Sequence, residues 1–400
     1  MARLKKPLAV LLLAGMTIYS AVQGSANAEP AQSAGTITTH AKAAALIDVE
    51  SGRILYEDHG TEEMRIASLT KIMTAIVAIE EGKLQDVVKV GKRAVGKEGS
   101  SIYLQLGEEM TLHNMLYGLM LRSGNDAATA VAEHVGGSEE GFVRLMNEKA
   151  EWLGLANTRF MNPHGLDQDG HYSSAVDLAK LTAYALHNSV FSEIVATRVK
   201  TAPNPHDAWD YKWTNKNKML SFYDGADGVK TGYTKTALRC LVSSATRGGQ
   251  RLAAVTLNDG DDWADHQKLL DYGYHHYPLT NLAEKGQGVS GYSLRAGRTF
   301  RYPLAKDEEG AVSSRLVLLD SAQPTAAYRL GERGRIDWYL NGVKIGTVPV
   351  YETDDKRTKG SDKPALSRRI GGTFEWRQGT ATLSEAFRSV VMALLRAGAG

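Results

Sequence analysis

Three short polar motifs occur in a fixed order along this chain, each set among apolar or small residues. They are Ser68-Leu69-Thr70-Lys71, Ser123-Gly124-Asn125 and Lys230-Thr231-Gly232. The first supplies a hydroxyl with an amine in reach, the second a hydroxyl with an amide, and the third a cation followed by a glycine gap. Acyl transfer needs a nucleophile, a base and donors for an oxyanion, so the combination predicts a site for that chemistry. Each motif alone is weak evidence.

The first motif lies at the start of an apolar run, residues 67–79, which predicts a buried helix. Residues three apart share a helix face, so Ser68 Oγ and Lys71 Nζ are expected to meet at the first turn. The positive end of the helix dipole favours an alkoxide on Ser68, and burial weakens the preference of Lys71 for its charged form, as a general base requires. Taken alone, a Ser-x-x-Lys string is more often an N-cap serine followed by a solvated lysine.

The second and third motifs are predicted at a turn and on a strand. Ser123-Gly124-Asn125 separates two helical runs, residues 112–121 and 127–132, and indicates a tight interhelical turn. Residues 230–232 indicate a short strand in which Gly232 lets another backbone approach closely. A substrate peptide could pair along such an edge, with the lysine and threonine meeting a carboxylate. Read singly, both motifs are ordinary turn chemistry.

In combination the motifs resemble those of the active-site serine penicillin-recognising enzymes. Over residues 36–278 the chain is similar to low-molecular-weight D-alanyl-D-alanine carboxypeptidases, on strings that extend the motifs: Arg65–Thr74, Leu121–Ala128, Asn162–Leu166 and Gly228–Thr234. Residues 213–220 and 258–263 look most like the sporulation-type enzyme that trims spore-cortex peptidoglycan. The resemblance implies an α/β (α+β) fold, a β-lactamase/transpeptidase-like domain whose antiparallel sheet is flanked by helices.

The resemblance also implies roles for individual residues. Ser68 would be the acyl-ester nucleophile, Lys71 the general base, and Ser123 the proton relay to the departing amine with help from Lys230. The substrate is a peptidoglycan stem peptide ending in D-Ala-D-Ala, and a β-lactam would trap Ser68 by the same chemistry. Backbone N–H groups of Ser68 and of the strand after Gly232 would stabilise the oxyanion. The substrate-binding residues implied are Asn125, Lys230, Thr231, Gly232 and Tyr233.

The chain departs from the family pattern at two places. Some relatives carry an arginine downstream of the third motif that binds the substrate carboxylate, and residues 259–263 of this chain contain none. Carboxylate recognition would then depend on Lys230 and Thr231. Residues 236–239 read Thr-Ala-Leu-Arg where relatives often have glycine and an aromatic, and they receive no functional assignment.

Both ends of the chain carry membrane-related patterns. Residues 1–28 have basic residues, a short apolar run and a small-residue end, which predicts a secretory signal peptide and an exported enzyme. Removing them takes the formal net charge from +2 to −1, which argues against a nucleic-acid partner. Residues 382–398 predict an amphipathic helix preceded by a basic stretch. The pattern fits equally a helix packed on a neighbouring domain and one bound to an anionic membrane surface; the resemblance favours the membrane, at the outer face of the cytoplasmic membrane.

The chain is long enough for two domains, and its character changes near residue 282. Residues 36–280 are expected to form the helix-rich catalytic domain. Residues 284–376 are expected to form a small all-β domain, with a hairpin signal at Asn341-Gly342. Cys240 is the only cysteine, so no internal disulfide forms, and we interpret it as a buried structural residue.

Other chemistries lack their motifs. No His-Glu-x-x-His string occurs, and the acidic clusters at residues 167–170 and 259–262 lack the later glutamate of a calcium loop, so no metal and no cofactor are expected. The serine elbow of α/β-hydrolases and glycine-rich phosphate loops are also missing. His164 lies among turn residues and is interpreted as holding a turn.

Three alternatives compete with a carboxypeptidase. A β-lactamase shares the three motifs, but the β-rich domain and terminal helix favour work on the cell wall. A wall-binding or β-lactam-sensing module without catalysis is disfavoured, because all the catalytic residue types are present. Transpeptidase or endopeptidase activity stays open, since an amine can resolve an acyl-enzyme as well as water can.

Overall fold

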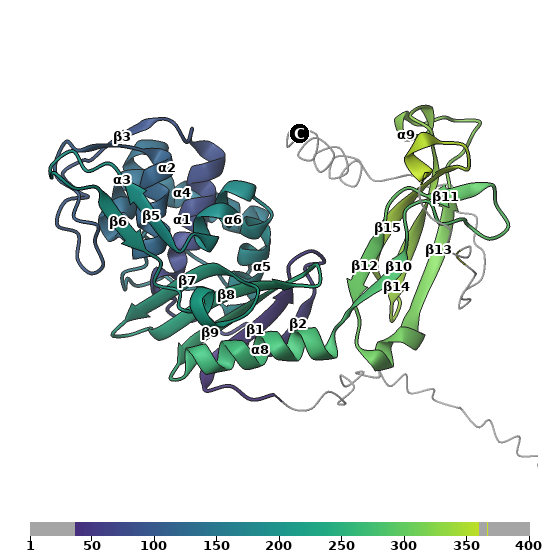
Figure 1. Ribbon diagram of the computed structural model, residues 1–400, viewed down its shortest axis with the longest axis horizontal. Coiled ribbons are helices and arrows are strands. Elements are labelled where there is room, and N and C mark those ends of the chain that lie inside the picture. The colour runs from purple at the N-terminus through teal and green to yellow at the C-terminus, as the bar shows by residue number, and fades with distance from the viewer. Residues whose placement is uncertain (1–36, 360–365, 367–400) are drawn as a thin grey trace, which may run out of the picture. The chain divides into compact units, whose positions relative to one another are not determined.

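The computed structural model describes residues 37–359 and residue 366. The predicted signal peptide, residues 1–28, and the predicted amphipathic helix, residues 382–398, lie outside the described residues. Along the described chain a helix-rich part runs to His276, and a β-rich part begins at Leu279 (Figure 1). No helix in this part of the chain is long and apolar enough to cross a membrane.

A five-stranded sheet forms the centre of the first part, with all neighbouring strands antiparallel and in the order β2-β1-β9-β8-β7. Alternate residues of the interior strand β1 enter two separate cores: Ala43, Ala45 and Ile47 pack in one, Ala44 and Leu46 in the other. This period of two is the expected signature of a sheet covered on both faces. The strands are β1 Ala41–Asp48, β2 Ile54–Asp58, β7 Ala226–Thr234, β8 Leu238–Arg247 and β9 Gln250–Asp259.

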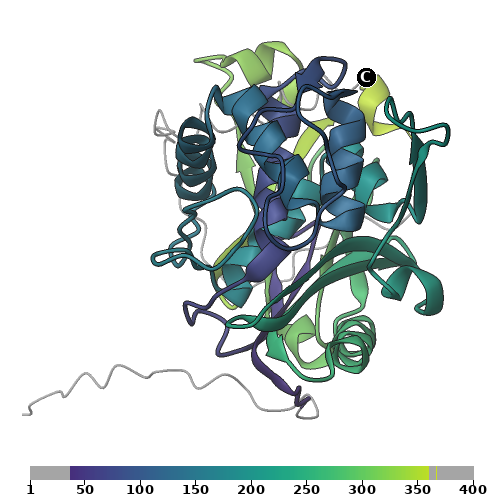
Figure 2. The same ribbon diagram turned by 90° about the vertical axis from the view of Figure 1, so that its left-hand side faces the viewer.

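Helices cover both faces of this sheet. One face carries the single long helix α8, Asp262–His276, and the other carries a cluster of helices. In Figure 2 this cluster faces the viewer. The clustered helices are α1 Lys71–Glu81, α2 Leu112–Arg122, α3 Asn125–Gly136, α4 Glu139–Trp152, α5 Ala175–Leu186 and α6 Ser189–Ala196. Four of them begin with a side-chain cap, of residue types that commonly occupy this position: Thr111 for α2, Ser138 for α4, Ser174 for α5 and Asn188 for α6.

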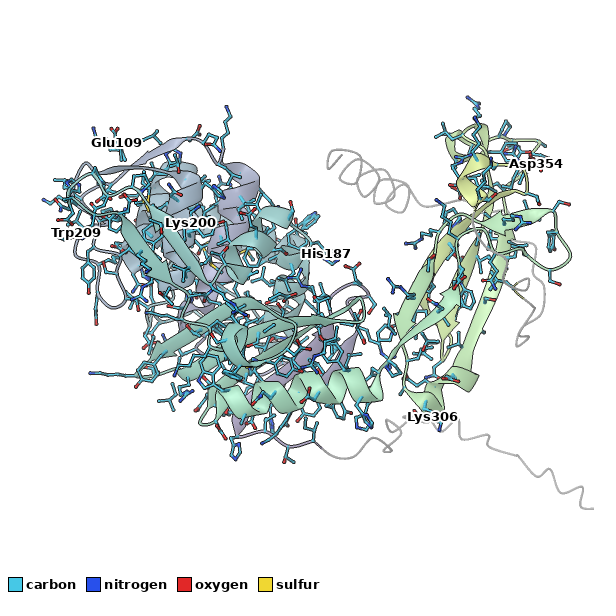
Figure 3. The ribbon with its side chains drawn as sticks, in the orientation of Figure 1. Glu109, His187, Lys200, Trp209, Lys306 and Asp354 are labelled. Atoms are coloured by element: carbon cyan, nitrogen blue, oxygen red, sulfur yellow. The ribbon has the colours of Figure 1, made fainter. Side chains whose placement is uncertain are left out.

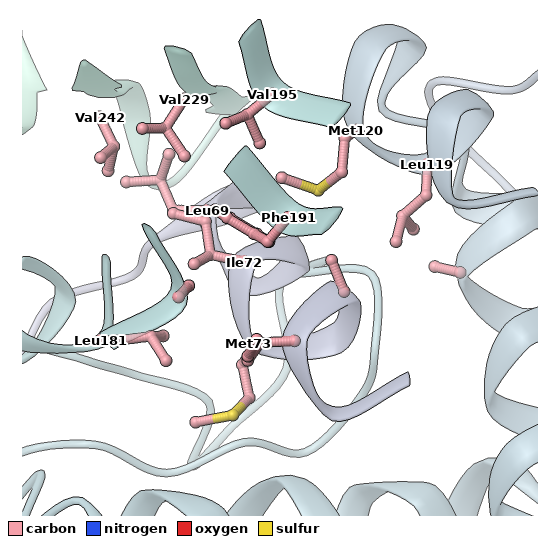
Figure 4. Packing of buried hydrophobic residues seen from close by; sticks show 14 of the residues in the cluster. Leu69, Ile72, Met73, Leu119, Met120, Leu181, Phe191, Val195, Val229 and Val242 are labelled. Carbon is pink, nitrogen blue, oxygen red and sulfur yellow. The ribbon is translucent and has the colours of Figure 1, made fainter. Parts of the chain in front are cut away.

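Helix α1 is buried along most of its length. Ile72, Met73 and Ile76 are completely shielded from solvent, and full burial of each such side chain contributes about 2 kcal/mol. Figure 4 shows Leu69, Ile72 and Met73 among apolar side chains of α2, α5, α6, β7 and β8. The prediction of a buried helix here is confirmed from Lys71 onward, whereas Ala67–Thr70 forms a 3₁₀ turn, η1.

Short elements connect this framework. They are the ribbon of β3 Val87–Lys89 with β4 Glu109–Thr111, the hairpin of β5 Val199–Ala202 with β6 Tyr211–Thr214, and α7 Met219–Phe222. Trp209, in the loop between β5 and β6, is 70% exposed and lies at the outer edge of the helical side (Figure 3).

The β-rich part has its own apolar core, which includes Ile336, Trp338, Val348 and Val350. Its four-stranded sheet has the order β11-β15-β14-β13, and β10 pairs with β12. The hairpin signal is confirmed: Leu340 pairs with Val343 across Asn341 and Gly342, both of which have positive φ. The elements are β10 Leu279–Ala283, β11 Leu294–Ala296, β12 Phe300–Pro303, η2 Lys306–Ala311, β13 Val312–Leu318, α9 Ala326–Arg329, β14 Glu332–Leu340, β15 Val343–Glu352 and η3 Lys356–Thr358. The predicted fold class, an antiparallel sheet flanked by helices with a separate all-β part, is confirmed.

Candidate active site

Ser68 and Lys71 meet at the junction of η1 and α1. Ser68 is the second residue of η1 and Lys71 the first of α1, and Lys71 Nζ lies 3.0 Å from Ser68 Oγ. A 3₁₀ turn has three residues per turn, so side chains three apart eclipse one another more closely than on an α-helix. The 3₁₀ geometry therefore brings the hydroxyl and the amine together on one face.

Lys71 Nζ has two further partners, and both are acceptors. Asn125 Oδ1 and the main-chain oxygen of His164 each lie 2.6 Å away. Burial, and then the positive charges of Lys230 and Lys216, hold the pKa of Lys71 well below its ordinary value. A neutral amine has two hydrogens and one lone pair, so it can donate to these two oxygens and accept the hydroxyl proton of Ser68. An amine in this arrangement can remove the proton of the Ser68 hydroxyl.

Hydrogen bonds of Thr70 stabilise the turn that carries Ser68. Thr70 Oγ1 donates to the main-chain oxygen of Ala67 at 2.9 Å and lies 2.8 Å from His171 Nε2. His171 Nδ1 accepts the N–H of Met161, so the proton of this ring is on Nε2, from where it can be donated to Thr70. Burial lowers the pKa of His171 to about 4, which keeps the ring neutral.

Gly165 packs directly against this turn. Its φ is +84°, and a Cβ placed on it would lie 1.9 Å from the main-chain oxygen of Ala67. Only glycine accommodates both the left-handed backbone and this close approach. The residue is therefore part of what shapes the Ser68 turn.

The second motif occupies the predicted turn between α2 and α3. Ser123 has φ +66° as the C-cap of α2 and is 4% exposed. Within the described residues its hydroxyl makes no hydrogen bond. The Asn125 amide, by contrast, is largely used inside the protein, because Nδ2 donates to the main-chain oxygen of Glu98 at 2.6 Å while Oδ1 accepts from Lys71.

The third motif lies on β7, at the edge of the sheet, as the sequence predicts. Lys230 is 1% exposed, its Nζ donates to the main-chain oxygen of Thr231 at 2.8 Å, and burial lowers its pKa to about 7. A Cβ added to Gly232 would lie 3.2 Å from the Ser68 nitrogen, so the β7 backbone passes close to Ser68. Tyr233, the next residue of β7, is 63% exposed.

Arg239 of β8 lies across the strand pair from the end of the third motif, opposite Tyr233. It pairs with Tyr233 in the β7–β8 register, and therefore projects from the same face of the sheet as Thr231 and Tyr233. Its Nε and Nη2 donate to the two carboxylate oxygens of Asp262, the first residue of α8, whose side chain is 6% exposed. Nη1 has no partner among the described residues, and the arginine side chain is 44% exposed.

Two features of this region do not follow from the three motifs. The His164 acceptor on Lys71 is a main-chain oxygen, and any residue type at that position could supply it. Arg239 required the register of β7 against β8, which a strand prediction around each segment could have supplied.

Cys240 pairs with Gly232 in the β7–β8 register but is buried within the sheet. Cys240 is 1% exposed, and burial raises the pKa of its thiol to about 12, as expected of a structural residue. No group of His, Cys, Asp and Glu side chains suited to hold a metal ion occurs within residues 37–359.

The fold and the three motifs together define a penicillin-recognising serine enzyme, and comparison with known proteins places the chain within that class. Residues 27–261 match the family model described as Peptidase_S11, D-alanyl-D-alanine carboxypeptidase, and the chain belongs to this family. It is 37% identical over 303 residues to the D-alanyl-D-alanine carboxypeptidase DacF of Bacillus subtilis, covering 74% of this chain and 77% of that protein. DacC of Escherichia coli is 32% identical over 345 residues, covering 80% and 85%.

Solved structures agree with this assignment. The chain superposes on penicillin-binding protein 5 of Haemophilus influenzae with a TM-score of 0.66 and 28% identity, covering 81% of this chain and 99% of that one. A D-alanyl-D-alanine carboxypeptidase of Mycobacterium tuberculosis gives a TM-score of 0.59 with 32% identity, covering 62% and 97%.

Proposed function

We propose that this enzyme removes the terminal D-alanine from peptidoglycan stem peptides through an acyl-enzyme on Ser68. The observation that carries the proposal is the environment of Lys71, whose amine lies 3.0 Å from Ser68 Oγ with two main-chain or amide acceptors at 2.6 Å. A neutral lysine so held accepts the Ser68 proton as Oγ attacks the carbonyl carbon between the two D-alanines.

The remaining steps are assigned to the second and third motifs. The N–H groups of Ser68 and Tyr233 receive the oxyanion, which the closeness of Gly232 to the Ser68 nitrogen supports. Ser123, whose hydroxyl is free of other bonds in the described structure, passes the proton from Lys71 to the departing amine. Water then attacks the ester, Ser68 regains its proton, and a stem one residue shorter is released. A β-lactam acylates Ser68 in the same way.

Recognition of the substrate is assigned to Asn125, to Thr231 of β7 and to Arg239 of β8. Asn125 has one N–H left for the substrate amide after its bonds to Lys71 and Glu98. Lys230 has a pKa of about 7 and donates to Thr231, so it is a weak anchor for an anion at neutral pH. We assign the terminal carboxylate to Thr231 together with Arg239, whose charge is permanent and whose Nη1 is free in the described structure.

A direct test uses the chain from residue 29 with a diacetyl-Lys-D-Ala-D-Ala peptide, following free D-alanine. The parent releases it and Ser68→Ala does not. No release by the parent, or equal release by the variant, overturns the assignment. A fluorescent penicillin in the same pair distinguishes an acylating enzyme from a wall-binding module, and slow loss of the label distinguishes it from a β-lactamase.

Export and membrane attachment are proposed from the sequence of the two ends. Residues 1–28 act as a signal peptide, and residues 382–398 with their basic flank bind an anionic membrane surface. Deleting residues 382–400 should abolish sedimentation with anionic liposomes, and equal sedimentation would contradict the anchor. A role in the spore cortex is supported by the similarity to DacF and to the sporulation-type motifs.

A further inference from the structure

A partly buried charged pair, Glu139 and Lys97, lies beside the His164 ring, and acyl transfer as described makes no use of it. Glu139 begins α4 and accepts from Lys97 Nζ at 3.1 Å, while its other oxygen lies 3.5 Å from His164 Nε2. The side chains of Glu139 and Lys97 are 12% and 22% exposed. The carboxylate is therefore shielded from water and shared between a lysine and an imidazole.

The hydrogen-bond partners of His164 define its tautomer. The N–H of Leu166 lies 3.3 Å from Nδ1, which must accept, so the ring proton is on Nε2 and points toward Glu139. Burial lowers the pKa of His164, so the ring is neutral near pH 7. The hydrogen bonds from His164 and Lys97 lower the pKa of Glu139 to about 2, so its carboxylate stays ionised.

The same histidine holds the acceptor of Lys71 on its main chain. Its turn is closed by Asn162 Oδ1, which accepts the N–H of Gly165 at 2.7 Å, and by Thr74 Oγ1, which donates to the oxygen of Pro163 at 2.6 Å. Among the described residues Glu139 is the one side chain that meets the His164 ring at a nitrogen. A contact path thus runs from Glu139 through the ring to the oxygen on Lys71 Nζ.

We propose that Glu139 is a positioning residue for the catalytic base: by holding the Nε2–H tautomer of His164 it keeps the main-chain oxygen of His164 on Lys71. This inference rests on the proposed role of Lys71. A neutral amine needs both of its hydrogens bound, here by Asn125 and by that oxygen, for its lone pair to face Ser68. If the turn relaxes, one hydrogen loses its partner and the lone pair is no longer directed.

The sign of the expected pH effect follows from the charges that face Lys71. Lys230 on β7 and Lys216 before α7 are cations that lower its pKa, and Asp126 on α3 is an anion that raises it. Removing Glu139 takes away a negative charge, leaves Lys97 uncompensated and weakens an acceptor of the charged amine. All three changes lower the pKa of Lys71, so the acid limb of acylation moves to lower pH while the plateau falls. Lys97→Met removes a positive charge, which raises the pKa of Lys71 and moves the acid limb to higher pH.

The experiment measures acylation by a fluorescent penicillin across pH, with rates expressed per titrated active site. Glu139→Ala is expected to lower the plateau rate about tenfold, a part of the roughly hundredfold or more that a positioned general base contributes, and to shift the acid limb to lower pH. Glu139→Gln keeps an acceptor for His164 and should retain more of the rate. Lys97→Met should shift the limb upward.

Glu140→Ala is the matched control, since Glu140 is the next residue of the same helix turn and pairs with Arg93 at the surface, 71% exposed. It should leave rate and profile unchanged. The inference is overturned if Glu139→Ala keeps the parental acylation rate and pH profile. It is also overturned if Glu140→Ala loses as much of the rate as Glu139→Ala does. A lower active fraction with an unshifted profile would assign Glu139 to folding alone and also overturns it. If the parent is not labelled, or Ser68→Ala still is, the proposed function fails instead.

Discussion

Asn125 Oδ1 lies 2.6 Å from Lys71 Nζ, although the two residues are 54 positions apart in the chain. The amide of the second motif is thus a partner of Lys71, the proposed base, and one of its N–H groups stays available for the substrate under the proposed function. Because the partner is a neutral oxygen, it binds an amine hydrogen without adding a charge that would favour the ammonium form.

Asn125→Asp is expected to slow acylation at neutral pH. A carboxylate 2.6 Å from Nζ raises the pKa of Lys71, keeps the amine protonated and removes the base, with a loss of about a hundredfold. The loss should shrink as pH rises, which stopped-flow labelling with a fluorescent penicillin can follow. Asn147→Asp is the control, because Asn147 also bonds main-chain groups through its amide but touches Val143 and Phe160 instead. An unshifted profile in Asn125→Asp would contradict the role given to this contact.

Gly165→Ala is expected to disturb the Ser68 turn. The added Cβ meets the Ala67 oxygen at 1.9 Å in a backbone with φ +84°. The positive φ alone costs about 1 kcal/mol, and the overlap forces η1 to move. We expect a lower midpoint in urea together with a loss of acylation.

Gly170→Ala distinguishes the cost of a positive φ from the cost of the steric overlap in Gly165→Ala. Gly170 has φ +79°, but its added Cβ would meet nothing nearer than Met161 Sδ at 3.7 Å. This control should lose about 1 kcal/mol of stability and keep its acylation rate. If both variants acylate at the parental rate, the contact between Gly165 and Ala67 does not shape the site.

Local sequence patterns predict several elements of the fold. The Asn341-Gly342 hairpin, the turn at Ser123 and the strand at Lys230 follow from residue preferences over a few positions, and the structure has all three. The η1 turn differs from the predicted regular helix because Ala67 adopts φ +47°, a conformation that its contacts with distant segments impose. The His164 acceptor is a main-chain oxygen, so the residue type at this position does not reveal it. The Arg239–Asp262 pair depends on how β8 lies against α8, which periodicity does not encode.

Lys230→Met is expected to change how stability depends on pH. The pKa of Lys230 falls from 10.5 to about 7 on folding, so between these values the unfolded chain binds a proton that the folded protein releases. Stability then rises with pH in this window, by up to about 1.4 kcal/mol per pH unit for one lysine. The variant should lose that slope in urea unfolding between about pH 7 and pH 9. Lys180→Met, at an exposed lysine of α5, should keep the parental slope, and an equal slope in Lys230→Met would contradict the prediction.

Arg239→Gln is expected to weaken recognition of the substrate carboxylate. The guanidinium is held by the buried Asp262 and keeps Nη1 free within the described structure, and a charge-assisted bond to a carboxylate contributes about 2 kcal/mol. We therefore expect the preference of the parent for a peptide ending in D-Ala-D-Ala over the same peptide ending in a carboxamide to fall roughly tenfold or more, chiefly through KM. Arg93→Gln breaks another bidentate pair, with Glu140 at the surface, and should keep the preference. Because the carboxamide lacks the group that Arg239 binds, its turnover should hardly change in Arg239→Gln. An equal loss on both peptides would mean that Arg239 supports the β7–β8 edge and does not recognise the substrate.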